Sequence, residues 1–177
     1  AIHRTLIPLT AAHQALRIVR SHFRVWGIDA NNVGIMGSSA GGHLASTVAT
    51  HYDSKETRPD FQILLYPVIT MDKTFTHMGS HNNLLGENPD KALEDKYSNE
   101  KQVTNDTPRA FIVVSAADDI VPVKNSLLYT QALIDHKVPV SLHVYPGGYH
   151  GFGFNASFKD ADIWHLELIR WLKRNGQ

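Results

Sequence analysis

Val33-Gly-Ile-Met-Gly-Ser-Ser39-Ala-Gly-Gly42 is the stretch of this chain that decides its fold. It joins an apolar run to a Gly-x-Ser-x-Gly pentapeptide, and a helix-forming segment begins directly after it at His43. A serine on a sharp turn between a strand and a helix adopts strained backbone angles, which small residues two places before and after it permit. This context predicts that Ser39 is a nucleophile. The alternative is an ordinary Gly-rich turn, of the kind that also binds phosphate.

The residue after the serine carries the second expectation. The amide N–H of Ala40, at the start of the predicted helix, points toward the place where negative charge develops on a carbonyl that Ser39 attacks. We therefore expect Ala40 to contribute to an oxyanion hole. A serine hydroxyl also needs a base, and that base needs an orienting acid.

Two later segments supply a carboxylate and an imidazole in that order. The apolar run 111–115 predicts a buried strand, and Asp118 and Asp119 follow it directly. The run 140–145 predicts the next strand, and the loop after it contains His150. Because the carboxyl ends of parallel strands meet at the same edge of a sheet, we expect these side chains to lie near Ser39.

Both later assignments have competitors. The chain has 11 histidines, and His150 is favoured because glycines lie on both sides of it, as in a loop that other atoms approach closely. Asp118 and Asp119 compete for the role of orienting acid. The other interpretation of Asp119 is a solvated capping or turn carboxylate.

These motifs resemble the α/β-hydrolase esterases known as xylanase-associated or acetylxylan esterases. The resemblance runs from about Pro8 to Phe154, and it includes the segments 26–46, 84–86, 97–98, 107–108, 115–122 and 145–154. In this fold the catalytic residues follow in the order Ser, Asp or Glu, His. The spacing Asp-x-x-Val-Pro, as known from such hydrolases, favours Asp118 over Asp119.

The resemblance implies an α/β-hydrolase fold with a mostly parallel sheet and helices on both faces, over a single domain spanning 1–177. It also implies that the chain is a serine esterase hydrolysing ester-linked acyl groups, such as acetyl groups on plant polysaccharides or oligosaccharides. A peptidase of the same fold is one alternative. A non-catalytic partial chain that needs a partner for its oxyanion hole is another.

One expected feature is missing before the nucleophile. The resembling family has an upstream strand ending in a His-Gly-Gly-type loop, which donates the other oxyanion amide. Only 38 residues precede Ser39 here, and they contain no such motif. We expect that the N-terminal strands of the fold lie upstream of Ala1; a second polypeptide that supplies them and a minimal variant of the fold are the alternatives.

Composition fits an enzyme domain of 177 residues. The 17 basic and 17 acidic side chains give no net charge, so we expect neither a nucleic acid nor an anionic membrane as a partner. The absence of cysteine excludes disulfides and thiol catalysis, and it fits both the cytoplasm and a secreted or periplasmic location. The expected chemistry needs no cofactor or metal. The oligomeric state is open.

Periodicity predicts the other elements. Strands are expected at 33–36, 61–66, 111–114 and 140–145, and helices at 43–51, 124–136 and 157–174. The first, second and third strands are continuous apolar runs, typical of parallel strands covered on both faces. The fourth alternates Val140, Leu142 and Val144 with polar residues, which indicates a half-exposed edge strand.

Helices with an apolar stripe on one face are expected at both ends of the chain. Thr10 is a candidate cap for an N-terminal helix that ends near Gly27, with a buried stripe of Ala12, Leu16, Val19 and Phe23. In the last helix Ala161, Trp164, Leu168 and Trp171 form another stripe. These tryptophans are interpreted as core residues rather than as platforms for sugars.

The segment 70–108 is a long polar insertion with many charges. Connections of this length are often functional, and in the resembling hydrolases the comparable segment borders the pocket. A solvated helical excursion is the equally weighted alternative. His77 and His81 are four residues apart within it, but without a third ligand nearby we expect no metal site.

Overall fold

A computed structural model describes residues 2–155 and 157–175 of the chain. The elements follow in the order α1 (Ile2–Ser21), α2 (Phe23–Trp26), β1 (Gly34–Ser38), α3 (Ala40–Thr50), β2 (Phe61–Leu65), α4 (Met78–Leu85), α5 (Lys91–Tyr97), η1 (Asn99–Lys101), β3 (Arg109–Ser115), α6 (Lys124–Asp135), β4 (Val140–Tyr145) and α7 (Ala161–Asn175). The four predicted strands and the helices after β1, β3 and β4 are therefore present, with shifted ends.

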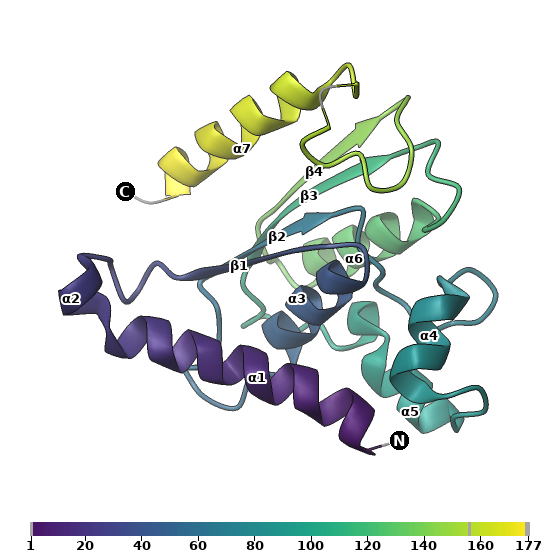
Figure 1. Cartoon of the computed structure of the whole chain (residues 1–177), viewed down its shortest axis with the longest axis horizontal. Coiled ribbons are helices and arrows are strands. Elements are labelled where there is room, and N and C mark those ends of the chain that lie inside the picture. The colour runs from purple at the N-terminus through teal and green to yellow at the C-terminus, as the bar shows by residue number, and fades with distance from the viewer. Residues whose placement is uncertain (1, 156, 176–177) are drawn as a thin grey trace.

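The strands form one parallel sheet in the order β1-β2-β3-β4 (Figure 1). Ser38 at the end of β1 pairs with Leu65, and Leu65 pairs with Val113. Strands that are consecutive in the sequence are thus neighbours in the sheet. Because all four run the same way, the loops after them leave from a single edge.

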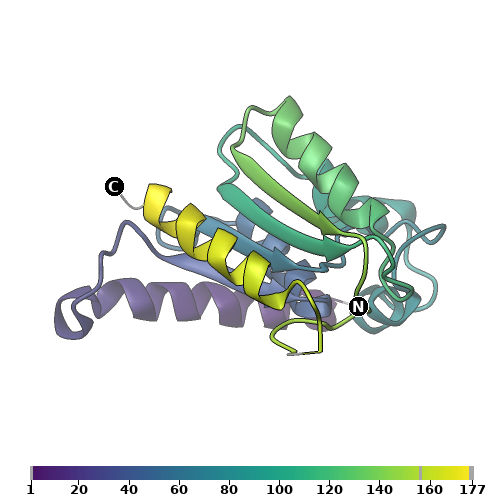
Figure 2. The same ribbon diagram turned by 90° about the horizontal axis from the view of Figure 1, so that it is seen from above.

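Helices cover both faces of the sheet, as predicted. α7 lies on one face, and α3 and α6 lie on the other, with α1 packed outside α3 (Figures 1 and 2). Strand β3 supplies both layers: Phe111 and Val113 face α7, whereas Ala110 and Ile112 face α3 and α6. A strand buried on both faces reads as a continuous apolar run, which is why β3 was recognisable in the sequence.

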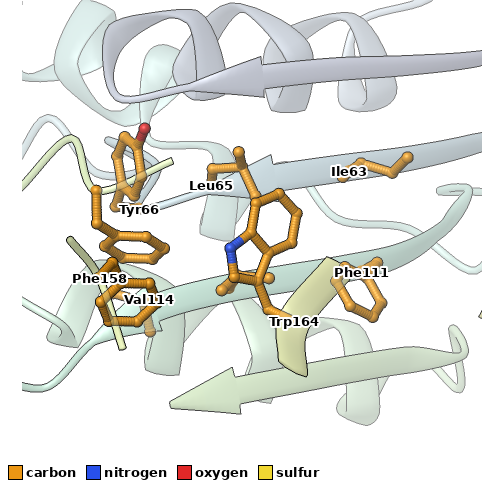
Figure 3. Packing of buried hydrophobic residues seen from close by; sticks show 9 residues of the cluster. Ile63, Leu65, Tyr66, Phe111, Val114, Phe158 and Trp164 are labelled. Atoms are coloured by element: carbon orange, nitrogen blue, oxygen red, sulfur yellow. The ribbon is translucent and has the colours of Figure 1, made fainter. Parts of the chain in front are cut away.

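The core under α7 is built on the buried indole of Trp164 (Figure 3). Its Nε1 donates a hydrogen bond of 3.2 Å to the carbonyl of Gly153. Leu168 and Trp171 pack against the same cluster, and the Arg109 guanidinium lies 4.3 Å from the Trp171 ring centroid. The tryptophans are therefore core residues, as predicted; the side chain of Ala161 lies outside the described residues.

The burial of the two edge strands differs from the sequence prediction. β1 is not covered on both faces, because Met36 is 47% exposed at the edge of the sheet. β4 is the other edge, as predicted, but its alternation does not hold: Val144, expected to face inward, is 43% exposed. Hydropathy alone identifies a strand here without identifying which of its faces is covered.

The N-terminal helix also differs from the prediction. α1 begins eight residues before Thr10, so Thr10 lies inside the helix and caps nothing. The helix packs against α3 and α4, and these tertiary contacts stabilise the turns that local signals did not predict. Leu16 and Val19 do face the core, whereas Phe23 lies beyond the end of α1 and is 38% exposed. The helical region does end at Gly27, which adopts the left-handed conformation.

The segment 70–108 folds into α4, α5 and η1 beside the carboxyl edge of the sheet (Figure 1). Met71, Leu85 and Tyr97 are buried in a small cluster that Val68 and Val121, from outside the segment, complete. The segment therefore has a core and is not only solvated. Among the described residues, none of the helices combines the length and apolarity that a membrane crossing requires.

Candidate active site

Ser39 occupies a strained turn between β1 and α3. Its φ of 54° and ψ of −123° are angles that a non-glycine residue rarely adopts. Backbone hydrogen bonds hold it there: its N–H donates to the carbonyl of Leu65 at 3.0 Å, and its own carbonyl accepts from the N–H of Val68 at 3.1 Å. The end of β2 thus fixes the turn that the pentapeptide predicted.

Two glycines of the turn are needed for space, and one of them, Gly37, stands at an expected position. A Cβ on Gly37 would lie 2.1 Å from the carbonyl oxygen of Gly41. A Cβ on Gly42 would lie 2.7 Å from Cβ of Pro67, whereas one on Gly41 would meet nothing within 4 Å. The steric requirement therefore falls on Gly37 and Gly42. At position 41, where a small residue was expected, the backbone leaves room for a side chain.

The three side chains singled out in the sequence form one hydrogen-bonded series. Nε2 of His150 lies 2.7 Å from Oγ of Ser39, and Nδ1 of His150 lies 2.8 Å from Oδ2 of Asp118. Because the carboxylate only accepts, Nδ1 carries the proton and Nε2 is left to accept from the serine hydroxyl. The Asp118 side chain is fully buried and the His150 side chain is 17% exposed.

The turn after β3 selects one of the two adjacent carboxylates. Oδ1 of Asp118 accepts hydrogen bonds from the N–H groups of Ile120 at 3.0 Å and Val121 at 2.8 Å. This leaves Oδ2 to face His150. Asp119 is exposed, and the carboxylate at hydrogen-bonding distance from His150 is that of Asp118.

Ala40 is the first residue of α3 and is exposed. The Ser39 side chain makes no capping hydrogen bond to the helix, because it is directed to His150. The N-terminal N–H groups of α3, with the positive end of its dipole, therefore lie beside the serine hydroxyl.

Comparison with known proteins agrees with the observed fold. A family model described as the alpha/beta hydrolase fold matches residues 2–154. The chain belongs to this family. An acetylxylan esterase of Xylanibacter ruminicola is 43% identical over 171 residues, which are 94% of this chain and 35% of that protein. Endo-1,4-beta-xylanase B of Butyrivibrio fibrisolvens is 39% identical over 81% of this chain and 24% of its own.

Solved structures give the same result. An acetyl ester-xyloside bifunctional hydrolase from Caldicellulosiruptor lactoaceticus superposes with a TM-score of 0.89 and 40% identity, over 95% of this chain and 65% of that one. A carboxylesterase from Lactobacillus plantarum superposes with a TM-score of 0.78 and 28% identity, over 95% and 67%. This α/β hydrolase thus spans about a third or less of the curated relatives and about two thirds of the solved ones.

Two side chains of this α/β hydrolase support the site although the sequence did not single them out. Oγ of Ser115 donates to the carbonyl of Gly148 at 3.0 Å and accepts from the N–H of Ala117 at 3.0 Å. It therefore joins the loop that contains Asp118 to the loop that contains His150. The only signal for Ser115 in the sequence was its place as a polar residue at the end of a buried apolar strand.

Tyr66 is the second of these side chains. It leaves β2 with a φ of 38°, and its ring lies edge-on to the His150 imidazole with 5.0 Å between centroids. Burial raises the pKa of its phenol, so the hydroxyl stays protonated and neutral beside the imidazole. Tyr66 thus supports the histidine from the end of the neighbouring strand.

The 70–108 segment of the hydrolase is connected to α3, the helix that follows Ser39, by hydrogen bonds of buried Asn99. Its Nδ2 donates to Oγ of Ser46 at 2.7 Å and to Oγ1 of Thr47 at 3.0 Å, both on α3. Its backbone N–H donates to the carbonyl of Ile69 at 3.1 Å. The residue before the segment, the start of η1 and α3 therefore meet at Asn99.

His43 makes a second connection between α3 and this segment. Nε2 of its buried ring donates to the carbonyl of Tyr97 at 2.8 Å. Burial lowers the pKa of His43 to about 4, so the ring is neutral at ordinary pH and Nε2 carries its single proton.

His77 and His81, considered above as a weak metal pair, have separate partners. Nδ1 of His77 accepts from the N–H of Ser80 at 3.2 Å and caps α4. The buried ring of His81 lies 3.1 Å from Oε1 of Glu94 on α5. Across residues 2–155 and 157–175, no group of three or more His, Cys, Asp or Glu side chains has the geometry to hold a metal.

Proposed function

We propose that this chain carries the active site of a serine esterase that hydrolyses acyl esters, above all acetyl esters on plant polysaccharides or their oligosaccharides. The observation that supports the chemistry is the hydrogen-bonded series of Ser39, His150 and Asp118. The names of the similar proteins, an acetylxylan esterase and an acetyl ester-xyloside hydrolase, support acetyl as the acyl group and a polysaccharide or oligosaccharide as the alcohol part of the ester.

In the first step Nε2 of His150 takes the proton of the Ser39 hydroxyl while Oγ attacks the ester carbonyl carbon. The carbonyl oxygen becomes negative and accepts a hydrogen bond from the N–H of Ala40. Asp118 stabilises the imidazolium that forms. When the tetrahedral intermediate collapses, the C–O bond to the alcohol breaks, and His150 gives its proton to the departing alcohol oxygen.

The second step uses the same groups on water. His150 removes a proton from a water molecule, whose oxygen attacks the carbonyl carbon of the acyl-serine. Collapse releases the carboxylic acid and returns the proton to Oγ of Ser39. Both steps proceed with protein side chains and water, and they call for no metal or organic cofactor.

Segment 70–108 belongs to the same domain in this proposal and borders the substrate pocket. Leu84 of α4 and Tyr97 of α5 line a cavity whose other wall includes Ala40. Their attachment to α3 through His43 and Asn99 holds this wall at a fixed position beside the nucleophile.

Active-site labelling tests the nucleophile directly. A fluorophosphonate probe should label the chain once by intact mass, and Ser39→Ala should abolish the labelling. Ser38→Ala is the matched control, because this exposed neighbour lies outside the hydrogen-bonded series. Equal labelling of wild type and Ser39→Ala would remove Ser39 as the nucleophile. Release of acetate from acetylated xylo-oligosaccharides then tests the substrate.

A further inference from the structure

Tyr66 has a backbone conformation that is costly for a tyrosine. Its φ of 38° is positive, which glycine adopts readily and bulky residues adopt rarely. Among the described residues, the other non-glycine residues with a positive φ are Ser39 and Lys137, which follows the end of α6. Strain of this kind persists where the surrounding structure imposes it, and it gathers at functional sites. A tyrosine in place of a glycine here therefore points to a use for its side chain.

Backbone hydrogen bonds fix the turn at the end of β2. The N–H of Tyr66 donates to the carbonyl of Val113 on β3 at 2.7 Å. One residue earlier, the Leu65 carbonyl accepts from the N–H of Ser39, and two residues later, the N–H of Val68 donates to the Ser39 carbonyl. The residues on either side of Tyr66 thus hold the nucleophile, while β3 holds Tyr66 itself.

The Tyr66 side chain contacts the loop of the base. Its ring lies edge-on to the His150 imidazole, with 5.0 Å between centroids and 67° between planes. The same ring meets Phe152 with 4.9 Å between centroids, and a Cβ on Gly153 would lie 3.1 Å from the Tyr66 hydroxyl oxygen. Tyr66 is 6% exposed and belongs to the core cluster under α7 (Figure 3). Its ring is therefore a fixed surface beside the imidazole.

We propose that Tyr66 is a positioning residue, whose ring blocks movement of the His150 imidazole away from Ser39 while its turn holds the Ser39 backbone. The inference rests on the proposed function, in which Nε2 of His150 takes the Ser39 proton over 2.7 Å. Asp118 directs the imidazole through a single hydrogen bond at Nδ1, about which the ring can still tilt. Tyr66 restricts this tilt, because a ring packed in the core occupies the space that the tilt needs.

Removal of the ring should lower turnover more than binding. Tyr66→Met keeps an apolar side chain but no ring, and it should lower kcat for 4-nitrophenyl acetate by roughly 10²-fold, since a misplacement of about 1 Å costs that much. KM should stay within about threefold, because the change acts on the transition state. Tyr66→Phe keeps the ring and should retain kcat within about threefold.

Tyr145→Met is the matched control for these variants. Tyr145 ends β4 and packs against the same core cluster, but its ring contact there is with Phe158. Its loss should therefore disturb the core under α7 and leave kcat within about threefold of wild type. Equal losses of kcat in Tyr66→Met and Tyr145→Met would overturn the positioning role. A loss in Tyr66→Phe as large as in Tyr66→Met would exclude the ring as its cause.

A measurement without turnover separates this inference from the proposed function. The ¹⁵N shift of His150 Nε2 reports its hydrogen bond to the Ser39 hydroxyl, so Ser39→Ala should change this shift in wild type and in Tyr66→Phe. In Tyr66→Met the same substitution should leave the shift nearly unchanged, because the imidazole no longer meets the hydroxyl. If this pattern is found but no ester is hydrolysed, the positioning role stands and the esterase proposal fails.

The opposite pattern would overturn the positioning role alone. In that case esters are hydrolysed, and Ser39→Ala changes the His150 shift in Tyr66→Met as much as in wild type. If Tyr66→Met does not fold, the wild type supplies the test. Nuclear Overhauser contacts between the ring protons of Tyr66 and His150, with one set of imidazole signals, would support the role, and their absence would contradict it.

Discussion

The Asp118 carboxylate faces the His150 ring with one oxygen and its own turn with the other. Oδ2 lies 2.8 Å from Nδ1 of His150, while Oδ1 accepts hydrogen bonds from two backbone N–H groups of the turn that follows β3. The turn fixes the carboxylate, and the carboxylate fixes the ring. The direction of Nε2 toward Ser39 therefore depends on backbone hydrogen bonds of a loop that starts from another strand.

Asp118→Asn should lower kcat/KM for 4-nitrophenyl acetate by roughly 10³- to 10⁴-fold, because an amide can donate to Nδ1 and favour the wrong tautomer of His150. Asp119→Asn is the matched control, and it should stay within about twofold of wild type because its side chain is exposed beside the same turn. A larger loss in the Asp119 variant than in the Asp118 variant would reverse the assignment.

Gly37→Ala should destabilise the fold by about 1–3 kcal/mol, because its Cβ would overlap the Gly41 carbonyl and push the nucleophile turn open. Gly41→Ala has room for its methyl group and should be neutral or stabilising by up to about 1 kcal/mol, since alanine favours the helix. Urea unfolding monitored by circular dichroism measures both free energies. Equal losses in the two variants would contradict the steric account of this turn.

His43 should make stability depend on pH. Its pKa falls from the ordinary 6.5 in the unfolded chain to about 4 in the fold, so the unfolded chain binds the proton first. The stability that His43 contributes is present above pH 6.5, decreases by about 3 kcal/mol as the pH falls to 4, and levels off below pH 4.

The matched variant for this dependence is His43→Gln, which keeps a side-chain N–H donor but does not titrate. The difference in unfolding free energy between wild type and His43→Gln, measured by urea unfolding from pH 8 to pH 4, isolates His43 from the other titrating groups. That difference should shift against the wild type across pH 6.5 to 4. Parallel curves would show that folding does not lower the pKa of His43.

Asn99→Ala should destabilise the protein by about 2–4 kcal/mol, because it removes the hydrogen bonds of a buried amide to α3, among them those to the hydroxyls of Ser46 and Thr47, and leaves these hydroxyls without that partner. Asn83→Ala is the control, since Asn83 is an exposed asparagine on α4, and it should change stability by less than about 0.5 kcal/mol. Thermal and urea unfolding measure both. A loss in Asn99→Ala no larger than in Asn83→Ala would show that the connection to α3 is weak.

Much of the fold could be predicted because its signals are local. Continuous apolar runs marked β2 and β3, and the pentapeptide marked the turn at Ser39. The edge strands were predicted less well, since hydropathy does not report which neighbour covers each face, as Met36 and Val144 show. Thr10 failed as a cap because contacts of α1 with α3 and α4 extend the helix beyond its local signals.

The supporting residues of the site could not be predicted in the same way. Ser115 reaches a carbonyl 33 residues away, and Asn99 reaches hydroxyl groups more than 50 residues away. Nothing in the sequence around Tyr66 indicates that its ring lies against His150. Contacts of this kind depend on which segments the sheet order brings together.

The sequence by itself determined that a serine follows β1 on a tight turn, and that a carboxylate and an imidazole follow later strands in the order typical of the fold. Periodicity and glycine chemistry act over a few residues, so they can be recognised without a structure. The sequence favoured Asp118 over Asp119 only through its resemblance to other hydrolases, and the tertiary structure places Asp118 against His150. The tertiary structure alone decided which glycines the turn requires for space and what encloses the cavity beside Ala40. These features depend on atoms from distant segments, whose positions are set only when the sheet and its helices have packed.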